Sequence, residues 1–187
     1  MTADARRVAV LVSGRGSNLK ALIAKASIYE IALVASNNPQ AQALDVARAA
    51  GLPTWTFDGR DTSRDDYDAM LSRSFDDHRI GTIALAGYMR LLSPWFVERW
   101  RGRIINIHPS LLPKYRGLKT HERALAAGER VSGCTVHVVT EELDSGEILA
   151  QAEVAIEPGD DAAALSERIL TAEHELYPAT LAKFVRR

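Results

Sequence analysis

The sequence first becomes strongly apolar in the segment Val8-Ala9-Val10-Leu11-Val12-Ser13-Gly14-Arg15-Gly16-Ser17-Asn18. Its five consecutive aliphatic residues are typical of a strand that is buried on both faces of a sheet. The glycine-containing stretch that follows ends this strand, and residues 19–26 have the composition of a helix. The segment therefore predicts a strand–loop–helix unit of the kind that builds α/β proteins.

The same alternation continues to the end of the chain. Further strands are predicted at residues 31–35, 54–57, 82–86, 103–107, 134–139 and 148–156. Helices are predicted at residues 40–50, 67–75, 120–127, from 94 onward and after 158–159. The last two strands have short connections, which favours antiparallel pairing. Residues 1–187 are therefore predicted to form a single domain, with a mostly parallel, doubly wound, Rossmann-like sheet and an antiparallel extension in the C-terminal third.

The composition of the 187 residues narrows the function classes. The 23 Lys and Arg against 24 Asp and Glu give a formal charge of −1, so there is no electrostatic drive toward nucleic acid or an anionic membrane. The single cysteine, Cys134, excludes an internal disulfide and a Cys-rich zinc site. No apolar stretch reaches the ~20 residues of a membrane span. These features predict a cytoplasmic protein that acts on small molecules, and they leave a homodimer open.

The loop at residues 13–18 has two interpretations. Glycines let the backbone approach a ligand closely, and free N–H groups at a helix N-terminus favour an anion, which predicts a phosphate site. The alternative is a tight turn with Ser17 or Asn18 as the N-cap. The dinucleotide fingerprint is incomplete, because Leu19 stands where its third glycine would fall. A single phosphate, as on a phosphosugar, fits this loop better.

A second polar feature lies at the end of the predicted strand 103–107. Asn106 and His108 are two residues apart, so their side chains share one face of an otherwise apolar strand. The alternatives are a capped strand end with a satisfied histidine, and a solvated hairpin turn for the acidic segment 141–146. A carboxylate beside an imidazole orients it and raises its pKa. An amide, an imidazole and a carboxylate together suit acyl transfer.

Taken together, these segments resemble a known family. The resemblance is carried by residues 13–19, 85–94, Asn106-Ile107-His108-Pro109-Ser110-Leu111-Leu112-Pro113, 133–137, Leu143-Asp144-Ser145-Gly146 and Glu173-His174. From residue 8 to about 184, the chain is similar to the phosphoribosylglycinamide formyltransferases, the folate-dependent formyl-transferring enzymes of purine synthesis.

The resemblance implies a role for each set of residues. The implied catalytic group is Asn106, His108 and Asp144. The implied contacts to the ribonucleotide substrate are Gly16, Ser17, Asn18, Leu170 and Glu173. The implied folate contacts are Arg64, Met89, Arg90, Leu91, Leu92, Asn106, Thr140, Glu141, Glu142, Leu143 and Asp144. The implied cosubstrate is 10-formyltetrahydrofolate, and no metal is implied.

The resemblance also implies a mechanism, in which the glycinamide amine attacks the formyl carbon. Asn106 and protonated His108 would stabilise the formyl oxygen, and Asp144 would orient His108. Relatives further imply a cis peptide bond between Leu112 and Pro113.

Three other interpretations share these residues. A hydrolase would discharge the same folate onto water, but such relatives usually carry an N-terminal regulatory domain for which this chain has no room. A non-catalytic folate or phosphosugar sensor would have an incomplete polar trio, whereas the trio is whole here. The tRNA-directed formyltransferases carry an added C-terminal domain. The main departure from the family is at Arg116 and Lys119, where relatives often read Pro-Gly-Leu-His, so positive charge is added near the expected site.

Overall fold

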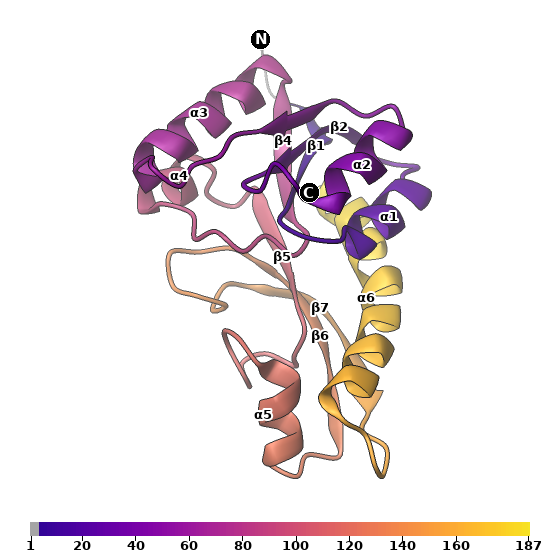
Figure 1. Cartoon of the computed structure of the whole chain (residues 1–187). Helices are drawn as coiled ribbons and strands as arrows, with labels where there is room; N and C mark the ends of the chain where they lie inside the picture. Colours follow the sequence, from indigo (N-terminus) through magenta and orange to yellow (C-terminus); the bar gives the residue numbers. More distant parts are fainter. Residues whose placement is uncertain (1–3) are drawn as a thin grey trace.

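The structure, a computed structural model, describes residues 4–187 and has one seven-stranded sheet in that range, with the order β3-β2-β1-β4-β5-β6-β7 (Figure 1). The strands are β1 (Asp4–Val12), β2 (Glu30–Ser36), β3 (Thr54–Thr56), β4 (Ile80–Leu85), β5 (Ile104–His108), β6 (Val131–Val138) and β7 (Ile148–Ala155). The helices are α1 (Ser17–Ala24), α2 (Gln42–Ala49), α3 (Arg64–Asp77), α4 (Pro94–Arg99), α5 (Thr120–Ala126) and α6 (Ala162–Phe184).

The strand directions confirm the predicted fold class. The first five strands pair in parallel, whereas β5 with β6 and β6 with β7 are antiparallel. The carboxyl ends of β1, β2, β4 and β5 therefore lie along one edge of the sheet, where ligands bind in open α/β sheets. The antiparallel β6 brings its own residues beside β5 and starts the loop that returns toward this edge.

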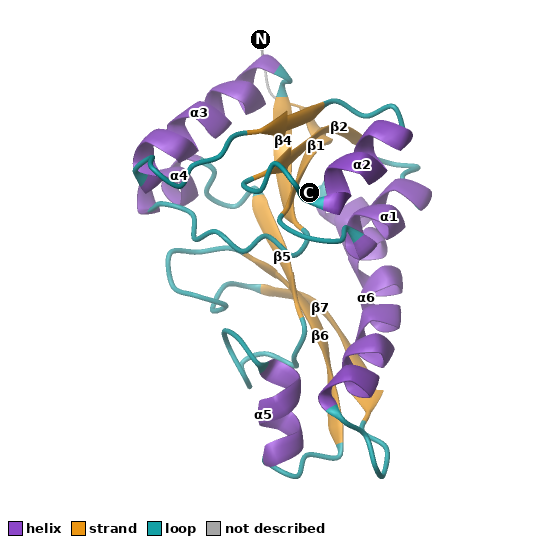
Figure 2. Ribbon diagram, viewed as in Figure 1, coloured by secondary structure: helices purple, strands orange, loops and turns teal. Residues whose placement is uncertain are grey.

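Two hydrophobic cores cover the two faces of the sheet, as the unbroken apolar strands predict. In β1, Val8, Val10 and Val12 pack with α1, α2 and α6, whereas Ala9 and Leu11 pack with α3 and α4. Figure 2 shows the two sets of helices on opposite sides of the strands. The period-2 alternation of a strand explains how one apolar run fills both cores.

The longest helix, α6, carries a polar residue in its apolar stripe. Leu165, Ile169, Glu173, Tyr177 and Leu181 follow one another at intervals of four residues and are all buried. Such spacing places all five on one face, toward the sheet. Glu173 is thus a carboxyl group held among core residues, which costs free energy unless it finds a partner.

Some boundaries differ from the sequence-based prediction. The strand β1 begins at Asp4 rather than Val8, because polar residues pair in the ladder at its exposed start. The helix α6 continues through Pro178 to Phe184, where Leu181 and Phe184 pack on the core. The Leu112–Pro113 peptide bond is cis, as predicted.

Candidate active site

Strand β5 places Asn106 and His108 on one face of the sheet. The flanking Ile105 and Ile107 point into the core beneath α6, so the two polar residues face the other way. In the neighbouring strand, His137 lies opposite Asn106. The predicted shared face of Asn106 and His108 is therefore present, and the antiparallel strand adds a second histidine to it.

The loop between β6 and β7 brings Asp144 to His108. Oδ2 of Asp144 lies 3.4 Å from Nδ1 of His108, and each side chain is only 7% exposed. The same oxygen accepts a hydrogen bond from the backbone N–H of Gly117 at 2.9 Å. The structure thus brings together all three residues of the predicted catalytic group, with the carboxylate anchored from the segment that follows β5.

The contacts of His108 distinguish its two ring nitrogens. Nε2 lies 3.0 Å from the carbonyl oxygen of Tyr115. A carbonyl oxygen only accepts, so Nε2 carries a hydrogen and donates it. In the neutral ring, Nδ1 then has the lone pair, and it is this nitrogen that faces Asp144. Nδ1 is therefore the nitrogen of the neutral ring that is able to accept a proton.

The electrostatics of the pair differ in part from the sequence-based expectation. Burial lowers the pKa of His108 below its usual value, and it outweighs the Tyr115 carbonyl and the Asp144 charge, which both raise it. The carboxylate thus acts in the expected direction but does not decide the net shift. Burial alone would raise the pKa of Asp144, yet contacts with His137, the Gly117 N–H and His108 hold it below its usual value.

His137 is a residue of this group that the sequence analysis did not select. Its side chain is 2% exposed, and Nε2 lies 3.5 Å from Oδ1 of Asp144 and 3.3 Å from Nδ2 of Asn106. Only the β5–β6 register, which pairs residue 137 with residue 106, reveals this proximity. Two sequence signals pointed to residue 137: it is a polar residue in the predicted strand 134–139, and it belongs to the segment 133–137 that carries the family resemblance.

The loop after β1 differs from the alternative in which a side chain caps α1. The N-cap of α1 is Gly16, with a left-handed φ of 82°, and neither Ser17 nor Asn18 caps the helix. A Cβ at Gly16 would lie 2.7 Å from Cβ of Ala43. Glycine is therefore required here by the backbone conformation and by the approach of α2, and no ligand is needed to explain it.

Asn18 connects this loop to Glu173 of α6. Nδ2 of Asn18 donates to Oε2 of Glu173 at 2.7 Å, and both residues are buried. Burial raises the pKa of the Glu173 carboxyl, and the hydrogen bond from Asn18 opposes this shift. Oδ1 of Asn18 has no partner among residues 4–187. Leu170, one turn before Glu173 in α6, is partly buried, and Ser17 directly precedes Asn18, so two further predicted ribonucleotide contacts flank this pair.

The segment after β4 presents an apolar surface. Met89 is 72% and Leu91 is 60% exposed, whereas Leu92 is partly buried. Exposed large apolar side chains side by side are typical of a surface that binds a ligand. Because Leu85 of β4 pairs with Asn106 of β5, this segment begins next to the candidate catalytic group.

Arg90 and Arg64 lie differently from their hydrophobic neighbours. The guanidinium of Arg90 turns inward and lies 4.4 Å from the ring centroid of Tyr67, a cation–π contact. Arg64 is exposed at the first residue of α3. The structure therefore supplies one exposed cation and one that is already engaged by the protein.

Asp68 carries a further buried carboxyl group. The helical periodicity of residues 67–75 did not predict that this residue is buried. It is fully buried, and Oδ2 accepts a hydrogen bond from the backbone N–H of Ser93 at 2.6 Å. Burial raises its pKa. Through Ser93, which caps α4, it holds the end of the 89–92 segment on α3.

The predicted folate loop at residues 140–144 is held by polar contacts. Oγ1 of Thr140 donates to the carbonyl of Glu142 at 3.1 Å, and the Glu142 carboxylate pairs with Arg116 at 2.8 Å. Glu141 is exposed, as is Leu143 at 55%. The positive charge of Arg116, which departs from the family, is thus matched by a carboxylate of this loop.

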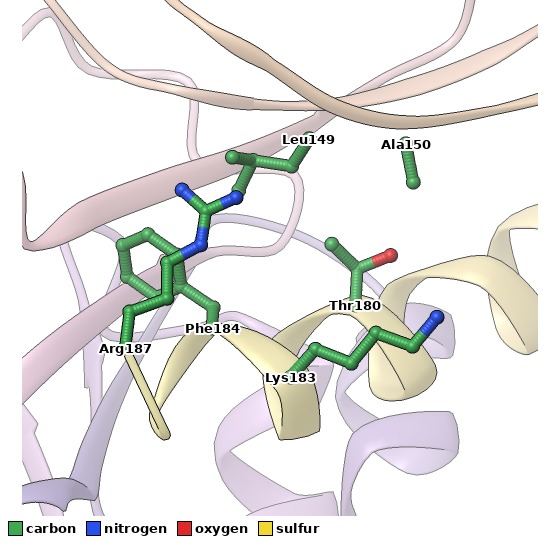
Figure 3. A pocket seen from close by; sticks show the side chains of 6 residues that line it. All are labelled: Leu149, Ala150, Thr180, Lys183, Phe184 and Arg187. Atoms are coloured by element: carbon green, nitrogen blue, oxygen red, sulfur yellow. The ribbon is translucent and has the colours of Figure 1, made fainter.

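Two hollows lie away from these residues. One, of about 80 Å³, lies between β7 and the end of α6 and is lined by Leu149, Ala150, Thr180, Lys183, Phe184 and Arg187 (Figure 3). The other, of about 370 Å³, lies at the amino ends of β1, β4 and β5, beside Thr82 and Arg103. Neither is lined by a predicted site residue. In residues 4–187, no helix has the length and apolarity to cross a membrane.

The sequence and the fold of the chain match a known class of proteins, the formyl transferases. Residues 6–181 match the formyl transferase family. The chain belongs to this family and, within it, to the phosphoribosylglycinamide formyltransferases, as the following relatives show. It is 43% identical over 186 residues to phosphoribosylglycinamide formyltransferase of Escherichia coli (strain K12), covering 95% of this chain and 86% of that protein.

Two further comparisons agree. A crystal structure of phosphoribosylglycinamide formyltransferase from Brucella melitensis superposes with a TM-score of 0.93 at 47% identity, over 97% of this chain and 96% of that one. The trifunctional purine biosynthetic protein adenosine-3 of Drosophila melanogaster is 50% identical in an alignment of 187 positions that covers 96% of this chain. The chain spans only 14% of the length of that trifunctional relative.

Proposed function

We propose that the protein transfers the formyl group of 10-formyltetrahydrofolate to the amine of 5-phosphoribosylglycinamide, a step of de novo purine (IMP) biosynthesis. The observation that carries this proposal is the buried His108–Asp144 pair at 3.4 Å, beside Asn106 at the carboxyl end of β5. The names of the relatives supply the acceptor, phosphoribosylglycinamide, and the transferred formyl group, whereas the folate donor rests on the family resemblance of the sequence. The arrangement of the three side chains suits acyl transfer.

In the proposed reaction, the glycinamide amine attacks the formyl carbon and a new C–N bond forms. Negative charge develops on the formyl oxygen, which the Asn106 amide and protonated His108 stabilise. Because Nε2 of His108 is held by Tyr115, the proton that charges the ring is on Nδ1, the nitrogen beside Asp144. The bond to N10 of the folate then breaks, N10 takes up a proton, and the amine loses one through a bound water.

Asp144 favours the charged form of His108. The carboxylate has a pKa below its usual value, so it is ionised at neutral pH. Since His108 is buried and its own pKa is lowered, the nearby negative charge counteracts the cost of protonating it. In this proposal Asp144 remains a charged carboxylate, whereas the imidazole of His108 takes up and releases the proton.

For the ribonucleotide, we propose that Gly16, Ser17 and Asn18 bind the phosphate at the start of α1, where backbone N–H groups favour an anion. Leu170 and Glu173 bind the ribose or glycinamide end. The unpartnered Oδ1 of Asn18 and the buried Glu173 support a polar ligand at this point. Burial also raises the pKa of the Glu173 carboxyl, and perturbed carboxyl groups of this kind cluster at functional sites.

For the folate, we propose that Met89, Leu91 and Leu92 line the slot for the flat pterin and that residues 140–144 close it. The exposed Arg64 binds the acidic glutamate tail. Arg90 contributes through its backbone, because its guanidinium lies on Tyr67. We further propose that residues 1–187 form a single formyltransferase domain that acts in the cytoplasm. Its partners are then its small-molecule substrates.

The experiment that tests this function follows formyl transfer by the purified protein with and without 5-phosphoribosylglycinamide. Formylated ribonucleotide should appear in a 1:1 ratio with released tetrahydrofolate, and little folate should be discharged without the acceptor. Rapid discharge that ignores the ribonucleotide would instead favour the hydrolase, and binding of both ligands without turnover would favour a sensor.

A further inference from the structure

The buried imidazole of His137 has no part in the reaction as described above. It lies opposite Asn106 across the β5–β6 pair and is almost inaccessible to solvent. Nε2 lies 3.3 Å from Nδ2 of Asn106, and Nδ1 lies 3.0 Å from the carbonyl oxygen of Val138. Both ring nitrogens are therefore engaged by groups of known hydrogen-bonding character.

These two contacts determine where the ring carries its proton. The Val138 carbonyl can only accept, so the hydrogen is on Nδ1. The amide nitrogen of Asn106 can only donate, so Nε2 must present a lone pair. One neutral form, protonated at Nδ1 alone, satisfies both neighbours.

We propose that His137 is a positioning residue that fixes the orientation of the Asn106 side-chain amide, an inference that rests on the proposed function. One N–H of the amide is held by Nε2 of His137, so the second N–H remains for the formyl oxygen. In the reversed orientation, the amide oxygen would face the lone pair of Nε2, and two acceptors would oppose each other. His137 thus keeps a donor rather than an acceptor at the place where negative charge develops.

The neutral form of His137 also leaves the carboxylate to His108. The charged or titratable groups beside His137 are Asp144, at 3.5 Å, and His108 of β5. A cationic His137 would donate to Asp144, compete with His108 for it and lose the bond from Asn106. The alternative arrangement is therefore well defined: His137 charged, and the amide oxygen of Asn106 turned toward it.

Nitrogen-15 NMR of the histidine rings in the full-length wild type tests the tautomer without reference to activity. We expect a neutral His137 with the hydrogen on Nδ1 and a lone-pair signal for Nε2 at neutral pH. The resonance is assigned by its absence from His137→Asn. A ring protonated on Nε2, or on both nitrogens, at neutral pH would overturn the proposal whether or not the protein is a formyltransferase.

Two substitutions separate the acceptor from the rest of the ring. His137→Asn offers an N–H near the position of Nδ1 for the Val138 carbonyl but no group that reaches Asn106. His137→Gln can place its amide oxygen near the position of Nε2. We expect kcat to fall roughly 10- to 100-fold in His137→Asn, up to the lower end of the loss for a missing oxyanion donor. The KM of both substrates should change less than about threefold, and His137→Gln should recover most of the loss. The control is His78→Asn, because the His78 side chain hydrogen-bonds to the Ser74 carbonyl of its own helix and His78 is not one of the predicted site residues.

A double-mutant cycle with Asn106→Ala tests whether His137 acts through Asn106. In that background, His137→Asn should lower kcat by no more than about twofold, because the group it positions is already gone. Losses that multiply in the double variant, or an unchanged kcat in His137→Asn alone, would overturn the proposal. Melting curves check that each variant is folded. If His137→Asn is not folded, the wild-type His137 resonance is assigned by its absence from His137→Gln, and the NMR result decides. If the wild type itself transfers no formyl group, the proposed function fails, and the tautomer is still measured.

Discussion

Nε2 of His108 donates a hydrogen bond to the carbonyl oxygen of Tyr115, 3.0 Å away. This contact holds one edge of the imidazole against the segment that follows β5 and turns Nδ1 toward Asp144. The same segment donates the Gly117 N–H to Asp144, so it positions both members of the pair. A histidine with one nitrogen held by the backbone can take up or lose a proton only at the other nitrogen. The Tyr115 contact therefore determines which ring nitrogen of His108 changes its protonation.

The charge of Asp144 should be visible in the titration of His108. Asp144→Asn keeps the shape of the side chain but removes the negative charge that raises the pKa of His108. Because burial already lowers this pKa, the variant should titrate at still lower pH than the wild type. NMR titration of the two proteins measures the difference, and an unchanged or raised pKa would contradict the pairing.

Gly16 and Gly14 should differ sharply in their tolerance of a side chain. At Gly16, a Cβ meets Ala43 at 2.7 Å and the φ is left-handed, whereas a Cβ at Gly14 has nothing within 4 Å. Left-handed backbone alone costs a residue other than glycine about 1–2 kcal/mol, and ~1 kcal/mol lowers the Tm of a chain of this size by about 2–4 °C. Gly16→Ala should therefore melt at least a few degrees lower, and Gly14→Ala should melt like the wild type.

The Gly16→Ala variant also tests whether the two ligands bind at separate places. Gly16→Ala should weaken ribonucleotide binding while the Kd of 10-formyltetrahydrofolate changes only a few-fold, because the folate slot lies on other loops. Calorimetric titration of both ligands at a temperature where the variant is folded measures this. Equal weakening of both ligands would count against separate subsites.

Glu173 should lower the stability of the folded protein at neutral pH while it contributes to binding of the ribonucleotide. Its folded-state pKa is raised above the usual 4.5, so the folded protein binds the proton more tightly than the unfolded chain. The wild type must then lose stability as the pH rises from 4.5 through the raised value, whereas Glu173→Gln has no such group. As the pH rises across this range, the Tm of the variant should increase relative to the Tm of the wild type. The KM of the variant for the ribonucleotide should be higher than that of the wild type. A variant that melts lower at pH 8 would contradict this account.

The ion pair between Arg116 and Glu142 should influence folate binding modestly. It connects the segment after β5 to the folate loop, but the side chains are 41% and 73% exposed. Exposed pairs contribute about 0.2–1 kcal/mol, which corresponds to at most about a fivefold change. Arg116→Glu should raise the KM for folate within this range, and the double variant Arg116→Glu with Glu142→Arg should restore it. Lys114→Ala, which breaks the neighbouring pair with Glu129, is the control and should leave this KM unchanged.

The fold could be predicted from the sequence because its signals are local. The apolar run from residue 8 to 12 needs cover on both faces, and the glycine-containing turn after it separates strand from helix. The shared face of Asn106 and His108 follows in the same way from the period of a strand. For these features, neighbouring residues carry the whole signal.

Other features of the site depend on the register between distant segments. His137 becomes part of the site only because it pairs with Asn106 from the adjacent strand, 31 positions away. The crowding of Gly16 comes from Ala43 in another helix. The net pKa shift of His108 depends on how deeply the ring is buried, which the presence of a nearby carboxylate in the sequence does not reveal.

The central claim is that protonated His108 stabilises the negative charge that develops on the formyl oxygen during transfer. A rapid-quench, single-turnover experiment with 10-formyltetrahydrofolate and 5-phosphoribosylglycinamide, comparing the wild type with His108→Ala, tests it most directly. A positioned acid contributes roughly 10²–10⁴-fold, so the variant should form formylated ribonucleotide more slowly by this factor while it binds folate with a Kd within a few-fold of the wild type. Formation of the product at the wild-type rate by a folded His108→Ala protein would contradict the account.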